Sequence, residues 1–247
     1  MNHESQILAG LSCRIVDALP AGASPHLVAI LCHGFGAPGT DLVSVASELV
    51  LLRPELADAV RFVFPAAPLR LDDVGMPGGR AWWMIDLDRL NAAMQRGELL
   101  DMRRETPEGL AEARARLMDL VHAVCERMSV ATAQVVLGGF SQGAMLSTDV
   151  TLRLEDAPAA LCIWSGTLLC EDDWRRLAPR RRGMPVLQSH GRNDPLLPFA
   201  AAESLRDLLQ EAGLQVEFLP FGGLHEIPRE ALRRFAELLM QLRASGA

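Results

Sequence analysis

The sequence predicts an α/β fold in which helices cover both faces of a mostly parallel sheet. Short runs of apolar, often β-branched residues alternate along the chain with longer stretches of helical spacing. Continuous apolar runs are typical of strands buried on both faces. One of them, 135–138, leads through a glycine-rich turn at 139–143 into a helical pattern. The chain has 247 residues without repeats or linkers, so we expect residues 1–247 to form a single domain.

The composition argues against several classes of protein. The net charge is −7, whereas a nucleic-acid surface would carry a basic patch. Tyrosine is absent, so an aromatic platform for stacked bases is not expected either. The five cysteines lack C-x-x-C spacing, which indicates buried thiols rather than a zinc site. We therefore expect no nucleic-acid partner, no metal and no cofactor.

The N-terminal segment gives an expectation about location. Residues 1–6 are polar and do not resemble a secretory signal. No apolar run approaches the length of a membrane-spanning helix. The sequence therefore predicts a cytoplasmic protein without a membrane span, and the quaternary state stays open, with a homodimer as one alternative.

Each element follows from local patterns, taken in chain order. Strands are expected at 12–18 (as an edge strand), 27–32, 60–64, 135–138, 160–164, 185–190 and 215–219. Helices are expected at 42–51, 106–125, after 143, 200–211 and 228–242. We predict that Asp41 caps the first helix and that Thr106 caps the second. Three consecutive arginines at 180–182 are expected in a solvated loop.

Between the third strand and the second helix, residues 69–106 show no clear periodicity. A segment of this length without its own structure is usually functional or disordered. Trp82 and Trp83 argue against disorder, so we expect the segment to cross the carboxyl edge of the sheet and to wall an active-site cleft. Neighbours in an extended segment face opposite ways, so one tryptophan should lie in the core and the other beside the cleft. Asp86 and Asp88 are interpreted as solvated charge.

The turn at 139–143 matches G-x-S-x-G and places Ser141 between a strand and a helix. A serine on such an elbow projects its hydroxyl above the sheet, while flanking glycines avoid clashes. The N–H of Gln142 would then lie at a helix N-terminus and could donate to an oxyanion. A second backbone donor is expected from Phe35, in the glycine-rich loop after the strand at 27–32.

A nucleophilic serine needs a base, and the base needs an orienting carboxylate. In this arrangement the chain order is serine, acid, histidine, and Asp194 and His225 follow Ser141 in that order, each in a loop after a strand. The alternatives are a plain turn at Asp194 and a surface histidine at 225. His33 and His190 are interpreted as structural hydrogen-bonding residues.

Apolar side chains near these positions predict the substrate contacts. Trp82 and Trp83 are expected to contact the substrate from residues 69–106. Leu196 and Leu197 directly follow Asp194, and Leu224 precedes His225. An apolar wall beside an oxyanion site favours an acyl chain.

Six ordered motifs extend the argument to most of the chain. They are His33–Leu42, Pro65–Pro68, Gly78–Trp83, Gly139–Gly143, His190–Asp194 and Gly223–His225. As a set they resemble the phospholipase/carboxylesterase family of α/β-hydrolases, which includes the acyl-protein thioesterases. The loop that begins at His33 is most similar to the bacterial esterase branch. The resemblance implies an α/β-hydrolase fold, a Ser141-Asp194-His225 triad and oxyanion donors at Phe35 and Gln142.

The expected activity is that of a serine carboxylesterase that hydrolyses short-to-medium acyl esters through an acyl-enzyme. Its partner would be a small-molecule ester or thioester. One alternative is an acyl-protein thioesterase or lysophospholipase. An alternative from another class is a non-catalytic protein of the same fold that only binds a small ligand.

Overall fold

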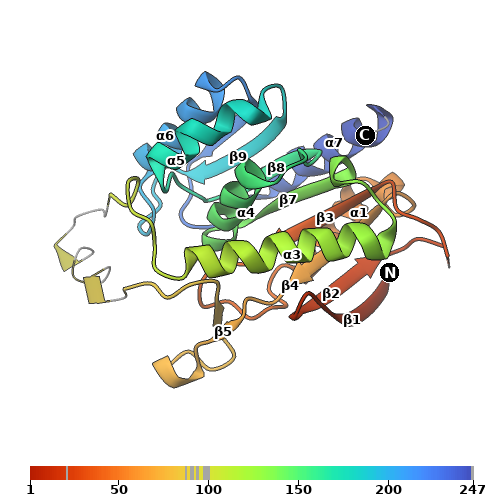
Figure 1. The fold of residues 1–247 in the computed structure, drawn as a ribbon, viewed down its shortest axis with the longest axis horizontal. Helices are drawn as coiled ribbons and strands as arrows, with labels where there is room; N and C mark the ends of the chain where they lie inside the picture. Colours follow the sequence, from red (N-terminus) through yellow and green to blue (C-terminus); the bar gives the residue numbers. More distant parts are fainter. Residues whose placement is uncertain (21, 87, 90–91, 93–94, 97–100, 246–247) are drawn as a thin grey trace.

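The computed structural model describes residues 1–20, 22–86, 88–89, 92, 95–96 and 101–245. Their main feature is an eight-stranded sheet with the order β1-β2-β4-β3-β7-β8-β9-β10 (Figure 1). The pairings of β1 with β2 and of β2 with β4 are antiparallel, and the others are parallel. The strands are β1 (Asn2–Leu8), β2 (Leu11–Asp17), β3 (Leu27–Cys32), β4 (Val60–Pro65), β7 (Val135–Phe140), β8 (Ala160–Trp164), β9 (Pro185–Gly191) and β10 (Gln215–Phe221).

Helices cover both faces of this sheet. One face packs against α1 (Val43–Leu52) and α7 (Arg229–Ser245). The other packs against four helices that lie in front of the sheet in Figure 1. They are α3 (Leu110–Met128), α4 (Gln142–Arg153), α5 (Glu171–Leu177) and α6 (Phe199–Glu211). Within the described residues, no helix has the length and apolarity needed to cross a bilayer.

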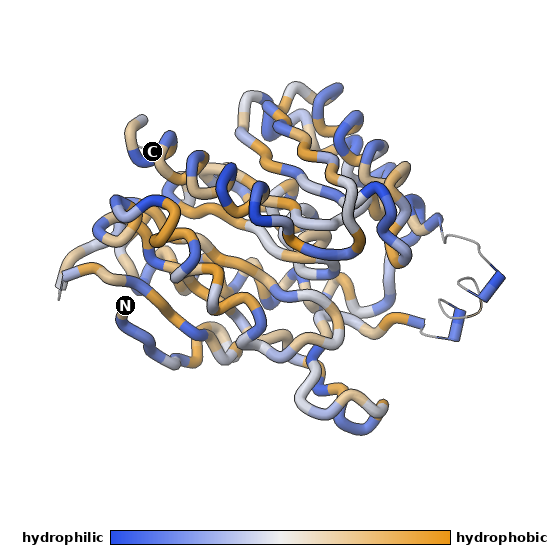
Figure 2. The backbone as a smooth tube through the Cα atoms, turned by 180° about the vertical axis from the view of Figure 1, so that it is seen from behind, coloured by the Kyte–Doolittle hydropathy of each residue, from blue (hydrophilic) through white to orange (hydrophobic). Residues whose placement is uncertain are grey.

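The central strands form the apolar interior of the sheet. Every residue of β3 and β8 is buried, and the predicted ranges 27–32 and 160–164 are confirmed. Figure 2 shows hydrophobic residues in orange along these inner strands, with blue hydrophilic turns on the outer helices. A small hairpin of β5 (Leu69–Arg70) and β6 (Arg80–Ala81) lies within the segment that was expected to lack structure.

The strand predicted at 12–18 is confirmed as β2, but its predicted position at the edge of the sheet is wrong, because β1 pairs along its outer side. Most of β1 is exposed and polar, so its sequence lacks the alternation that marks a half-buried strand. Ala9 and Gly10, both with positive φ, form a two-residue turn to β2. A polar outer strand also protects the edge of the sheet from pairing with other chains.

Both predicted helix caps are wrong. Leu42 is the N-cap of α1, and no side chain caps this end; the Asp41 N–H instead donates to a turn carbonyl. The helix predicted from Thr106 begins later, at Leu110, because Gly109 before it has φ 83°. A left-handed residue cannot belong to an α-helix, so residues 108–109 form a turn before the helix.

The expectation of a solvated loop at 180–182 is wrong for Arg181. Its side chain is buried, with 4% of the residue exposed. It donates to the carbonyls of Thr151 (Nε, 2.7 Å) and Leu154. These carbonyls belong to the C-terminal end of α4, where a cation is favoured. Arg181 therefore caps the helix that begins beside Ser141.

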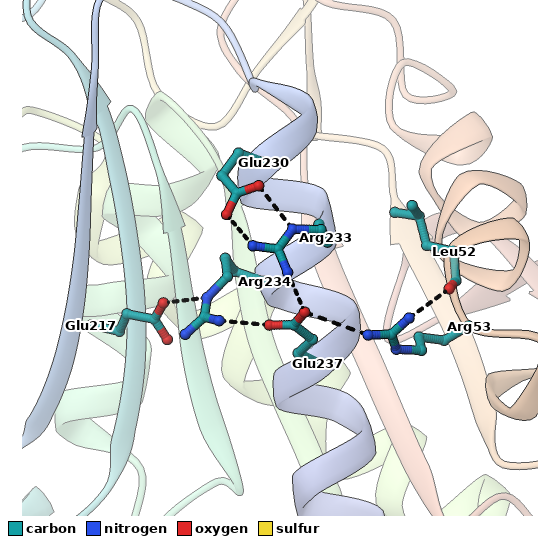
Figure 3. Close-up of polar contacts among 7 residues, drawn as sticks. All are labelled: Leu52, Arg53, Glu217, Glu230, Arg233, Arg234 and Glu237. Atoms are coloured by element: carbon teal, nitrogen blue, oxygen red, sulfur yellow. Dashed lines mark hydrogen bonds and ion pairs between the residues drawn. The ribbon is translucent and has the colours of Figure 1, made fainter.

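A network of exposed ion pairs fixes α7 to its neighbours (Figure 3). Arg234 contacts Glu217 of β10 and, at 2.7 Å, Glu237 of α7. Glu237 also accepts from Arg53, at the end of α1, over 3.4 Å, and Arg233 bridges Glu230 and Glu237 along the helix. The network thus joins three elements at the surface.

The five cysteines are unpaired thiols, and four of them are buried. Burial raises the pKa of Cys13 and of Cys32 to about 12. The fully buried Cys162 has its pKa raised well above the ordinary value for the same reason, and burial also raises the pKa of Cys125 and Cys170. These thiols therefore stay protonated at neutral pH.

Candidate active site

Ser141 occupies a sharp turn between β7 and α4. Its backbone has φ 54° and ψ −119°, a conformation that non-glycine residues rarely adopt. The Ser141 N–H donates to the Trp164 carbonyl of β8 (2.9 Å), and its carbonyl accepts from Ala144 (3.0 Å) and Met145 (3.1 Å). Strained residues held by their surroundings in this way cluster at functional sites.

The glycines of the turn are required by close backbone packing. A Cβ added to Gly139 or Gly143 would collide with the Cys32 carbonyl at the end of β3. A Cβ on Gly34 would lie 3.3 Å from the Ser141 Cβ. The loop after β3 therefore lies directly against the serine turn, and larger residues at 139 or 143 would force them apart.

His225 and Asp194 are joined by a hydrogen bond of 2.7 Å between Nδ1 and Oδ2. The Asp194 Oδ1 accepts from the N–H groups of Leu196 and Leu197, each at 2.9 Å. The His225 ring also packs on Phe140, the residue before Ser141, with 4.7 Å between ring centroids. The loops after β9 and β10 thus meet the end of β7 at the carboxyl edge of the sheet, where ligand sites of parallel sheets lie.

The Asp194 carboxylate is buried yet ionised. Burial by itself raises its pKa, but the hydrogen bonds from His225 and from the Leu197 and Leu196 N–H groups together hold the pKa below its ordinary value. These donors stabilise the charged form. A fixed carboxylate on Nδ1 leaves Nε2 of His225 as the nitrogen that can accept a proton.

Gln142 links the serine turn to the segment at 69–106. It is the first residue of α4, so its N–H has no acceptor within the helix. Its buried side chain accepts from the Trp82 N–H (Oε1, 2.9 Å) and donates to the Trp83 carbonyl (Nε2, 2.8 Å). The side chain of Gln142 therefore ties the start of α4 to the backbone of Trp82 and Trp83.

His33 holds the loop of Phe35 in place, as the sequence predicts for a structural histidine. Its Nδ1 donates to the Gly34 carbonyl (2.8 Å), and its Nε2 accepts from the Ala67 N–H (3.0 Å). Its carbonyl accepts from the Trp82 indole N–H (3.0 Å). Burial lowers the pKa of His33, which keeps the ring in this neutral tautomer.

A cavity of about 560 Å³ opens above these residues. Ser141, Gln142, His225 and Phe35 all line it. Its apolar lining consists of Phe35, Ala37, Trp83, Met84, Ile85, Met102, Pro107, Phe140, Met145, Leu169, Leu196 and Leu197. Its charged lining consists of Asp41, Asp86, Arg89, Glu105 and Glu108. Residues within 83–86, Arg89 and residues within 102–108 therefore contribute to the lining, while the remainder of 69–106 includes positions outside the described residues.

Two predicted substrate contacts are corrected by this lining. The Trp82 indole points to the His33 carbonyl and lies in the core instead. Leu224 is 57% exposed and lies outside the lining. Of the two tryptophans, Trp83 lines the cavity and Trp82 does not, as predicted, although both side chains are buried.

Sequence reasoning missed Phe140, Met145 and Leu169 as lining residues. Met145 follows Ser141 by four positions in a helical pattern, so the two share a face of α4. That spacing was a readable signal. Leu169 lies beyond β8, in a loop at the carboxyl edge, where only the general rule for parallel sheets points to it.

Residues that could hold a metal are not gathered at this site. The carboxylate of Asp86 accepts from the Arg89 N–H at 2.9 Å. Across the described part of the chain, no group of three His, Cys, Asp or Glu side chains is arranged so that it could hold a metal ion. That catalysis needs no metal or cofactor stays a prediction, which chelation tests.

Comparison with known proteins identifies the family. Residues 18–242 match the Phospholipase/Carboxylesterase family. The chain is 26% identical over 239 residues to acyl-protein thioesterase 1 of Neurospora crassa, covering 95% of this chain and 94% of that protein. It is 27% identical over 234 residues to a probable carboxylesterase of Oryza sativa subsp. japonica, covering 91% and 81%.

Solved structures show the same fold. The structure of esterase PE8 has a TM-score of 0.73 at 24% identity and covers 94% of this chain and 99% of that chain. A carboxylesterase from Mesorhizobium loti has a TM-score of 0.71 at 18% identity, covering 97% and 99%. The chain therefore belongs to the phospholipase/carboxylesterase family of α/β-hydrolases, and it is a hydrolase of ester bonds.

Proposed function

We propose that the protein is a serine carboxylesterase that acts on short-to-medium acyl esters through Ser141, Asp194 and His225. The observation that carries the proposal is the 2.7 Å bond between His225 and Asp194. It orients an imidazole on the wall of the cavity that also exposes Ser141 at its strained turn.

The mechanism follows from this geometry. Nε2 of His225 takes the proton of the Ser141 hydroxyl as the oxygen attacks the ester carbonyl, and Asp194 stabilises the imidazolium. The N–H groups of Phe35 and Gln142 receive the oxyanion. The alcohol leaves with the proton from His225, and water activated by the same ring then releases the acid from Ser141.

The lining indicates the acyl group. A cavity of about 560 Å³ with mostly apolar walls fits a chain of limited length, which gains about 0.8 kcal/mol for each buried CH₂. Each added methylene should therefore raise kcat/KM about fourfold until the cavity is filled.

The charged lining favours the carboxylesterase over a lysophospholipase. Among the described residues, four carboxylates face the cavity and Arg89 is the one arginine or lysine of the lining; Glu105 engages it in two contacts of 2.7 and 3.0 Å. A phosphate headgroup would meet uncompensated negative charge there, which costs binding energy. Neutral esters avoid this repulsion.

Acyl-protein thioesterase activity is a second candidate, favoured by the names of relatives such as that of Neurospora crassa. Ester and thioester carbonyls need the same nucleophile and oxyanion donors. The two candidates differ in substrate size and in the leaving group. They are therefore separated by kinetics and not by labelling.

A fluorophosphonate probe tests the catalytic serine. Covalent labelling is expected at Ser141 and should be lost in Ser141→Ala. The same variant should hydrolyse p-nitrophenyl butyrate with a kcat lowered by a factor of about 10⁴–10⁶. A folded wild-type protein that neither labels nor hydrolyses would instead be the non-catalytic binder. Hydrolysis retained within tenfold in Ser141→Ala would contradict the assigned nucleophile.

A panel of p-nitrophenyl esters from two to sixteen carbons, with matched thioesters, tests the substrate. We expect kcat/KM to climb over short chains and then level off. Truncation of Met84 and Ile85 to alanine should flatten the climb, because both line the cavity. Leu224→Ala is the matched control, since this exposed leucine lies outside the lining. A steady climb to palmitoyl substrates, or cleavage of thioesters alone, would favour the thioesterase.

A further inference from the structure

Two imidazoles, and not one, lie on the Asp194 carboxylate. Nδ1 of His225 is 2.7 Å from Oδ2, and Nε2 of His190 is 3.3 Å from the same oxygen. His190 is fully buried at the end of β9 and does not line the cavity. It therefore reaches the carboxylate from the interior, whereas His225 reaches it from the side of the substrate.

The tautomer of His190 follows from its neighbours. Its Nε2 lies 3.1 Å from the Leu197 carbonyl, and a carbonyl oxygen only accepts hydrogen bonds. The second neighbour, Oδ2 of Asp194, is ionised and also only accepts. Nε2 must therefore carry the proton, which it donates to the Leu197 carbonyl, while Oδ2 of Asp194 lies 3.3 Å from the same nitrogen. Nδ1 then lacks a proton. It makes no hydrogen bond within the described residues, although the Gly166 carbonyl is close enough to raise the pKa of the ring.

The neutral form of His190 is the one that the site favours. Burial lowers its pKa, while the Leu197 carbonyl, the Asp194 carboxylate and the Gly166 carbonyl raise it in part. A second imidazolium beside the imidazolium that forms on His225 would also be repelled. A neutral ring donates one N–H and adds no charge to the site.

We propose that His190 is a positioning residue that acts on catalysis through Asp194. Its N–H lies 3.3 Å from Oδ2 and, by donating to the Leu197 carbonyl, fixes the loop whose N–H groups donate to Oδ1. The polar N–H beside Oδ2 also makes this oxygen a weaker acceptor for the proton of His225. The proposal rests on the proposed function, since it concerns the same triad.

A pH-dependent test has to consider every charged group around the triad. Glu226 follows His225, and its Oε1 accepts from the Leu224 N–H at 3.3 Å. Arg192 lies over the Phe199 ring of α6, with 4.9 Å to the centroid. Across the cavity lie Asp41, Asp86, Arg89, Glu105 and Glu108. Variants at position 190 leave all of these in place, so a change in the pH profile reports on the carboxylate.

The first experiment is ¹⁵N NMR of the imidazole nitrogens in the unaltered protein, with the His190 signals assigned from the His190→Gln spectrum. We expect a neutral ring with the proton on Nε2 between pH 6 and 8. A proton on Nδ1, directed to the nearby Gly166 carbonyl, would overturn the proposal. This measurement needs no activity, so it stands even if Ser141 proves not to be the nucleophile.

The second experiment compares three variants in kcat/KM as a function of pH. His190→Leu removes the N–H, and we expect about a tenfold loss and an acid limb whose midpoint moves up by about half a pH unit, because an unrelieved carboxylate stabilises the imidazolium. His190→Gln places an amide N–H at the position of Nε2 and should restore both properties. His190→Asn, whose amide is one bond too short, should behave like the leucine variant.

If His190→Leu does not fold, the glutamine and asparagine variants still test the proposal, because they differ only in the length of the side chain that carries the amide. Equal pH profiles in the glutamine and asparagine variants would overturn the proposal. So would a loss of activity in proportion to melting temperature with an unchanged acid limb. In either case His190 would only stabilise the fold.

Discussion

Asp194 and Asp149 are two buried carboxylates in one interior, and their side chains are equally inaccessible. Asp194 accepts from backbone N–H groups and from His225. Asp149, in α4, accepts from the Trp174 indole (2.8 Å), from Arg153 (3.1 Å) and from Arg114. The first lies at the carboxyl edge of the sheet, and the second joins three helices.

The difference lies in what the partners can do. An arginine keeps its proton in a protein, so the arginine partners of Asp149 have a fixed charge, and the cluster serves as a clamp between α3, α4 and α5. A histidine exchanges its proton near neutral pH, so Asp194 faces a group whose charge changes. Burial alone therefore does not distinguish the two carboxylates. The nature of their donors does.

The sharpest test replaces each carboxylate by its amide, beginning with the larger effect. Asp194→Asn should reduce kcat by about 10⁴, because the amide favours the wrong tautomer of His225. The melting temperature should change little, since an amide oxygen still accepts from the Leu196 N–H. Steady-state kinetics with a thermal scan measures both. A variant with near-normal kcat would remove Asp194 from the triad.

Asp149→Asn should show the reverse pattern. It removes the carboxylate that pairs with Arg114 and leaves Arg153 paired with Asp173 alone. Loss of one partner of a buried ion pair typically costs about 3–5 kcal/mol of unfolding free energy. Activity per folded molecule should be unchanged, when active sites are counted by fluorophosphonate labelling. Denaturant unfolding gives the stability. A drop in kcat for the labelled fraction would show that the clamp also positions the serine helix.

Acidification should weaken the fold through its neutral buried histidines. Burial lowers the pKa of His33 and His190, so below about pH 6.5 these histidines are protonated in the unfolded chain but stay neutral in the folded chain. The unfolding free energy should therefore decrease as the pH decreases, by up to about 1.4 kcal/mol per pH unit for each histidine, until the pH reaches their folded pKa values.

The Asp194 carboxyl affects the unfolding free energy at lower pH, because its lowered pKa keeps it ionised in the folded state at pH values where the unfolded carboxyl is already protonated. Its stabilisation is present above the unfolded value near 3.9 and is lost as the pH falls through the folded value. Denaturant unfolding at pH 7.5, 6.5 and 5.5 checks the histidine part. His33→Gln should reduce the slope, whereas His122→Gln, on an exposed position of α3, should not. A stability independent of pH in this range would contradict the neutral rings.

The smallest effect is expected from the exposed ion pairs on α7. Arg233→Ala breaks its contacts with Glu230 and Glu237, in which about half of each partner's side chain or less is exposed. Such pairs contribute about 0.2–1 kcal/mol. The loss should shrink further in 1 M salt, where screening acts over a few ångströms. If Arg233→Ala lowered the unfolding free energy as much as Asp149→Asn does, solvent exposure would not explain the difference between the two networks.

The sequence alone predicts the sheet interior well because burial on both faces leaves a continuous apolar run. The strands at 27–32 and 160–164 match residue by residue. The loops of Ser141 and Asp194 follow from the same logic, since each comes after such a strand. The loop of His225 follows β10, an outer strand of the sheet whose residues are exposed or only partly buried. Parallel pairing then brings the three loops together at one edge.

The failures have the opposite cause. The polar strand β1 is held by pairing, which periodicity does not reveal. The start of α3 depends on the positive φ of Gly109, and the burial of Arg181 depends on the free carbonyls of α4. Leu224 was placed by its neighbour in sequence, but adjacent loop residues face different ways. Each of these outcomes is set by tertiary contacts.

The protonated thiols have a practical consequence. With burial raising the pKa of all five, maleimides at neutral pH should react slowly with the native protein. A cysteine introduced at Met84, which is 47% exposed at the cavity, would then be the preferred point of attachment for a fluorophore. Because the protein's own thiols react slowly, a fluorophore at this one position could report substrate entry without labelling elsewhere.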